Sequence, residues 1–113
     1  MKSEILELMR DKGGEGISFA EFGGIDGFKG DYCWGHAEYN VQYWCGLSRE
    51  AADAFAELLS EGLIELRPTS VLVYAIDGQI LNMPIAKGMK RYKKPRWLPL
   101  VMNLTDAGGK VPS

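Results

Sequence analysis

Residues 48–62 constrain the fold most, because they carry a start signal, an apolar face and a stop signal for a single helix. Ser48 is a preferred N-cap residue, and Gly62 readily adopts the left-handed backbone that commonly follows a helix. Between them, apolar side chains recur at helical spacing, so one face can be buried. These are Ala51, Ala52, Phe55, Leu58 and Leu59. We therefore expect a helix here, followed directly by β structure.

The first half of the chain predicts further helices. Residues 3–12 place apolar side chains at helical spacing and end at a Gly-Gly pair. Ser18 and Glu21 match a capping box, which predicts a short helix within residues 16–22. Residues 23–35 are rich in glycine and aromatic side chains, so we expect an ordered loop. A further helix is expected from His36 to Cys45, where Gly46 follows as a stop signal.

The second half predicts strands. We expect strands at residues 63–66, 71–76 and 79–83, the last two joined as a hairpin by the turn at Asp77 and Gly78. Residues 97–104 predict a last strand at a sheet edge, because the neighbouring prolines lack amide donors. The 113 residues therefore predict one α+β domain, with residues 109–113 as a frayed tail.

The order of these elements resembles that of a winged-helix domain. Residues 44–64 resemble a helix-turn-helix that passes into a wing, with Gly46, Leu47 and Ser48 as its turn. Leu104–Gly108 is similar to the strand-to-helix exit of MarR-like proteins. The resemblance implies a winged helix-turn-helix fold, with N-terminal helices, a β-hairpin wing and a C-terminal edge strand. It also implies DNA binding and transcription regulation, as in small bacterial or phage regulators.

Charge is sorted along the chain. Residues 1–66 contain 13 acidic and 5 basic residues, whereas residues 67–113 contain 8 basic and 2 acidic residues. Six of these bases fall within residues 87–96, which we call the basic loop. No acidic residue occurs between Asp77 and Asp106, so the basic loop has no local counter-charge in the sequence. Such a segment is either solvated or bound to an acidic surface or to phosphates.

The second helix of the predicted helix-turn-helix, between Ser48 and Gly62, has an acidic outward side. Its negative charge opposes contact between that helix and phosphates. We therefore predict a nucleic-acid-binding protein that contacts phosphates through the basic loop. Tyr92 or Trp97 could stack on an exposed base or sugar, although a tryptophan that opens an apolar strand is more often part of the core. The predicted nucleic-acid-binding residues are Lys87, Lys90, Arg91, Lys93, Lys94, Arg96, Tyr92 and, on the helix, Arg49.

A protein-interaction module without DNA binding is the alternative. Eight of the twelve aromatic residues lie between Phe19 and Trp44, where they build either the core or a patch for a partner. A basic protein partner would then face the acidic side of the helix. The residues of this acidic face are Glu50, Asp53, Glu57 and Glu61.

Catalytic and metal chemistry have weak sequence signals. Cys33, His36 and Cys45 could ligate a metal or form a thiolate–imidazole pair, but they lack the paired spacing of zinc sites and a third catalytic group. We expect no enzymatic activity, no metal and no cofactor. The N-terminus lacks a secretion signal and no apolar run is long enough for a membrane span, so we expect a cytoplasmic protein with free thiols. The sequence leaves homodimerisation open.

Overall fold

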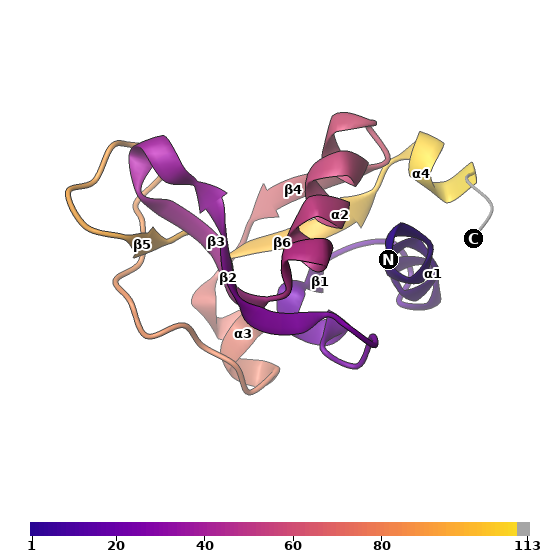
Figure 1. The fold of residues 1–113 in the computed structure, drawn as a ribbon, viewed down its shortest axis with the longest axis horizontal. Helices are drawn as coiled ribbons and strands as arrows, with labels where there is room; N and C mark the ends of the chain where they lie inside the picture. Colours follow the sequence, from indigo (N-terminus) through magenta and orange to yellow (C-terminus); the bar gives the residue numbers. More distant parts are fainter. Residues whose placement is uncertain (111–113) are drawn as a thin grey trace.

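The computed structural model describes residues 1–110, which fold into a mixed α+β structure (Figure 1). The α+β class predicted from the sequence is therefore confirmed. In chain order, the elements are α1 (Lys2–Asp11), β1 (Ile17–Ser18), the 3₁₀ helix η1 (Phe19–Phe22), β2 (Lys29–His36), the 3₁₀ helix η2 (Ala37–Tyr39), β3 (Val41–Leu47), α2 (Arg49–Ser60), β4 (Ile64–Pro68), α3 (Val71–Ile76), β5 (Arg96–Trp97), β6 (Leu100–Leu104) and α4 (Asp106–Lys110).

The strands of residues 1–110 form two small sheets. One sheet has the order β1-β6-β4, and β6 is antiparallel to both neighbours. The other has the order β2-β3-β5: β2 and β3 form an antiparallel hairpin, and the short β5 lies parallel to β3. Because β5 and β6 are consecutive in the chain, residues 96–104 link the two sheets.

Aromatic side chains dominate the core between these sheets and the helices. Phe55 of α2 is fully buried, and its ring centroid lies 5.2 Å from that of Phe19 and 5.3 Å from that of Phe22. Trp44 and Trp97 join the same core. The aromatic residues concentrated in the first half of the chain therefore mostly build the core.

Several predicted elements are confirmed. The N-terminal helix is α1, the short helix is η1, and the Ser18 N–H donates to Glu21 Oε2 at 2.8 Å as in a capping box. The helix after Ser48 is α2, and the Ser48 hydroxyl accepts the Ala51 N–H at 3.1 Å. The strand after Gly62 is β4.

The predicted loop at 23–35 and helix at 36–45 are wrong, because residues 29–47 form the β2–β3 hairpin. The buried residues of β3 are Val41, Trp44 and Leu47, and this spacing of three is compatible with a helix, which accounts for the wrong prediction. The antiparallel pairing of β3 with β2 favours the strand. Close backbone contact at Gly35 also favours the hairpin. Since α2 follows a strand, the first helix of the predicted helix-turn-helix is not formed.

The predicted hairpin at 71–83 is also wrong, because residues 71–76 form α3. The Ser70 hydroxyl caps this helix by accepting the Leu72 N–H. The buried Tyr74 hydroxyl accepts the Phe19 N–H at 3.1 Å and donates to the Leu100 carbonyl, so α3 is anchored to η1 and β6. Burial raises the pKa of the Tyr74 phenol, so the group stays a neutral hydrogen-bonding hydroxyl. Residues 77–95, which include the predicted strand at 79–83, contain no helix or strand.

The predicted last strand divides at Leu98 and Pro99 into β5 and β6. Only β5 lies at a sheet edge, whereas β6 is the central strand of its sheet, so the predicted edge position is half right. In the predicted frayed tail, Gly109 and Lys110 belong to α4, and residues 111–113 lie outside the described residues. Within residues 1–110, no helix has both the length and the apolar character needed to cross a membrane.

The two cysteines form a disulfide, contrary to the prediction of free thiols. Cys33 and Cys45 are directly opposite each other in the β2–β3 hairpin, and their Cα atoms are 4.0 Å apart. The hairpin therefore supplies the proximity that the linear sequence does not show.

We expect Gly35→Ala to lower the free energy of unfolding by about 2 kcal/mol. In the hairpin, an added Cβ would meet the Val41 carbonyl oxygen and lie 2.7 Å from Gln42 Cα. In a helical or loop segment, the same change would be neutral or stabilising. Urea unfolding followed by circular dichroism measures the difference.

Gly24→Ala is the matched control, because an added Cβ there has no atom within 4 Å. We expect its unfolding free energy to stay within about 0.5 kcal/mol of the natural protein's. Equal stability of the two variants would contradict the close hairpin contact at Gly35.

Candidate nucleic-acid interface

The basic loop lies against the tip of the β2–β3 hairpin, at the opposite end of the molecule from α1 and α4 (Figure 1). Asn40 at the tip has left-handed backbone (φ 58°), which asparagine adopts more easily than most residues. Its Nδ2 donates to the Tyr92 carbonyl at 2.8 Å, and the Tyr92 N–H donates to the Tyr39 carbonyl at 3.0 Å. The Arg96 N–H donates to the Asn40 carbonyl at 2.8 Å. The loop is thus held on the hairpin by its backbone.

Tyr92 organises the basic loop from within. Its hydroxyl accepts the Lys87 N–H at 2.8 Å and donates to the Gly88 carbonyl at 3.1 Å. The Arg96 guanidinium lies over the ring, 4.8 Å from the centroid. Tyr92 was predicted to stack on nucleic acid, but the hydroxyl and part of the ring already have partners within the loop. Trp97 is fully buried and is a core residue.

The cationic side chains of the basic loop remain largely uncompensated. Lys87, Lys90, Lys93 and Lys94 are exposed, and no carboxylate of residues 1–110 lies within 4.0 Å of their ammonium groups. Arg91 is exposed but pairs with Glu38 at 2.5 Å. The loop therefore gathers positive charge that can attract a polyanion.

A surface hollow of about 370 Å³ lies within the basic loop. The lining combines apolar and cationic side chains: Pro84, Arg91, Tyr92, Lys93, Lys94, Pro95 and Arg96. Lys93 and Lys94 therefore line the hollow and are also exposed to solvent.

Arg49 lies apart from the basic loop. It follows β3 at the end opposite the hairpin tip, where its guanidinium lies 4.9 Å from the centroid of the Tyr32 ring. Its Nε is also 3.4 Å from Asp53 Oδ1. The structure therefore brings six of the predicted bases together with Tyr92 and leaves Arg49 outside the cluster.

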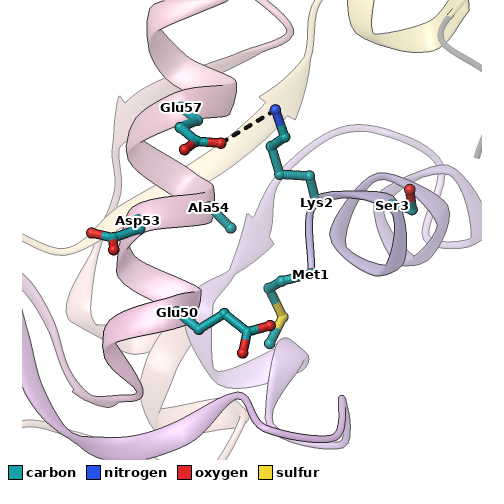
Figure 2. A pocket seen from close by; sticks show the side chains of 7 residues that line it. All are labelled: Met1, Lys2, Ser3, Glu50, Asp53, Ala54 and Glu57. Atoms are coloured by element: carbon teal, nitrogen blue, oxygen red, sulfur yellow. Dashed lines mark ion pairs between the residues drawn. The ribbon is translucent and has the colours of Figure 1, made fainter.

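The acidic face of α2 borders a second hollow, of about 660 Å³, beside the first residues of α1 (Figure 2). Glu50 and Glu57 point towards α1, whereas Asp53 points away from it. Lys2 Nζ lies 3.3 Å from Glu57 Oε2 and 2.9 Å from Glu61 Oε1. These contacts raise the pKa of Lys2, and Glu61 contributes more to the increase than Glu57 does. Three of the four predicted acidic residues thus have a partner in this chain, because Asp53 is also paired with Arg49.

The protein-interaction alternative needs aromatic residues on the surface, and half of the eight between Phe19 and Trp44 are buried in the described structure. Phe19, Phe22, Phe28 and Trp44 are buried, Tyr32 is exposed, and the other three aromatic residues, Trp34, Tyr39 and Tyr43, are half-buried. A basic protein partner for the acidic face stays a prediction.

Cys33, His36 and Cys45 do not form the metal site or the thiolate–imidazole pair considered in the sequence analysis. The disulfide removes both thiols as nucleophiles and as thiolate ligands. The His36 ring stacks on Tyr39, with centroids 4.3 Å apart. Among residues 1–110, no group of three or more histidine, cysteine or acidic side chains is arranged to hold a metal ion.

No protein-family model, curated protein or solved structure matches this chain. Membership of a winged-helix family therefore stays a prediction. Two of the elements on which the resemblance depends, the predicted helix at 36–45 and the predicted hairpin at 71–83, fold differently here.

Sequence reasoning missed the hairpin-tip residues that hold the basic loop. Glu38, Tyr39 and Asn40 were assigned to a helix, so their contacts with the loop were not anticipated. A turn-forming asparagine between two segments rich in aromatic residues was the available signal.

We expect Asn40→Gly to loosen the basic loop without unfolding the protein. Glycine retains access to left-handed backbone but removes the hydrogen bond to the Tyr92 carbonyl, which is worth about 1 kcal/mol. Hydrogen exchange measured by mass spectrometry should become about 5-fold faster in peptides covering residues 87–95. Peptides from α2 are the internal control, and unchanged loop exchange would contradict the role of Asn40.

Proposed function

We propose that this protein binds nucleic acid by contacting backbone phosphates with the basic loop. The observation that carries the proposal is the collection of Lys87, Lys90, Lys93 and Lys94 as exposed cations on a loop tied to the hairpin tip. Lysine and arginine contacts with phosphates release counterions and supply most of the affinity of non-specific binding. A loop that is already held in place loses less conformational entropy on binding than a free segment does.

The acidic face supports the choice of the basic loop over α2. Glu50, Asp53 and Glu57 would meet phosphates with like charge if α2 entered a groove. Helix α2 also follows strand β3, so the proposal rests on the loop and does not require a winged helix-turn-helix. A role in transcription regulation would additionally require sequence preference, since phosphate contacts alone carry none.

The cytoplasmic location expected from the sequence also stays a proposal. The Cys33–Cys45 disulfide is more typical of an oxidising compartment, because cytosolic thiols are kept reduced.

We expect the natural protein to bind labelled random-sequence DNA with a Kd of about 10⁻⁴–10⁻⁶ M at physiological salt, and more tightly at low salt. Reversing Lys90, Lys93 and Lys94 together to Glu should weaken binding by about 10-fold or more, because three phosphate contacts become repulsive. The salt dependence should also become shallower. Fluorescence anisotropy with single-stranded and duplex DNA measures both effects.

The matched control reverses Lys29, Arg67 and Lys110, which gives the same net charge but leaves the basic loop intact. We expect this control to bind more tightly than the loop variant. Reversal of Glu50, Asp53 and Glu57 to Lys should not weaken binding. Absence of binding by the natural protein at low salt, or equal losses in the two reversed variants, would overturn the proposal.

A further inference from the structure

We propose that the hollow in the basic loop accepts one unpaired base of a single-stranded nucleic acid. This inference rests on the proposed function and specifies its ligand. The hollow has a volume of about 370 Å³, which falls within the range of about 300–1,000 Å³ typical of small-molecule sites. It is therefore large enough for a part of a nucleotide and far too small for a duplex.

The lining has the mixed character that a nucleotide requires. Pro84, Tyr92 and Pro95 supply apolar surface for the faces of a base. Lys93 and Lys94 are exposed on the same hollow and can contact the phosphates on either side of that base. The positive charge therefore favours a polyanion as the ligand. The apolar surface favours a polyanion that carries bases over one that carries only phosphates.

The internal contacts of the loop keep this surface in place before a ligand binds. The Tyr92 hydroxyl is held by Lys87 N–H and the Gly88 carbonyl, and the Arg96 guanidinium covers part of its ring. Elsewhere in the lining, the Pro84 carbonyl accepts the N–H of the buried Trp97 at 2.8 Å. Both parts of the lining are thus connected to the fold.

An unpaired base fits this arrangement better than a paired one. Bases in a duplex are stacked and paired, so one would have to leave the helix at an energetic cost before entering the hollow. Bases of a single strand are accessible, and proteins that bind single strands commonly combine a cationic path with apolar or aromatic contacts to bases. The structure therefore favours single strands over duplexes at equal phosphate number.

The test compares a labelled oligothymidylate with an abasic deoxyribose-phosphate strand of the same length. The two probes have the same phosphate charge and differ only in their bases. We expect the natural protein to bind oligothymidylate about 10-fold more tightly, as base contacts of this type predict. Pro84→Leu, which narrows the hollow without changing charge, should remove this difference and leave abasic binding unchanged.

Asn82→Leu is the matched control, because Asn82 is exposed in the same connection but does not line the hollow. It should retain the preference for bases. Equal binding of the two probes by the natural protein would overturn the inference while leaving phosphate binding by the loop intact. A preference for bases that survives Pro84→Leu would overturn the hollow as its source, and binding of neither probe would overturn the proposed function as well.

Amide chemical shifts of the natural protein provide a second measurement that does not depend on the folding of a variant. Oligothymidylate should produce shifts in residues 91–94 and at Arg96 that the abasic strand does not produce. Identical shift patterns for the two probes would overturn the inference.

Discussion

The burial of Trp97 is the interaction on which the arrangement of the basic loop depends. The Trp97 ring centroid lies 6.0 Å from that of Trp44 on β3 and 5.1 Å from that of Tyr74 on α3, and its Nε1 donates to the Tyr43 carbonyl at 3.2 Å. Its backbone N–H donates to Pro84, and its carbonyl accepts the Ala86 N–H at 2.7 Å. One fully buried side chain therefore fixes both ends of the segment that carries the cations.

Local signals predicted those parts of the fold that depend on neighbouring residues. The cap at Ser48 and the apolar face of α2 were readable because the responsible side chains lie within a few residues of the backbone groups that they serve. The failures occurred where tertiary contacts decide. The apolar run that forms α3 suits a strand equally well, and the hydrogen bonds of Tyr74 to Phe19 and Leu100 favour the helix.

The sequence predicted which basic residues form the candidate site, but it did not predict the contacts that hold the basic loop in place. The cluster of bases is visible in the sequence, because no acid interrupts it. Its attachment to Tyr39 and Asn40 depends on a hairpin that brings together segments about half the chain apart, and so does the pairing of Arg91 with Glu38. The inward role of Tyr92 was hidden for the same reason, because a sequence shows an aromatic among bases but not the partners of its hydroxyl.

Charge separation gives the molecule two distinct surfaces, an acidic one beside α1 and α2 and a basic one at the hairpin tip. The central claim is that the basic one meets nucleic acid, and lysine acetylation with and without single-stranded DNA tests it most directly. Mass spectrometry should show protection of Lys90, Lys93 and Lys94 by DNA, with Lys12 and Lys110 unaffected. Equal modification of Lys90, Lys93 and Lys94 in the presence and absence of DNA would contradict the account.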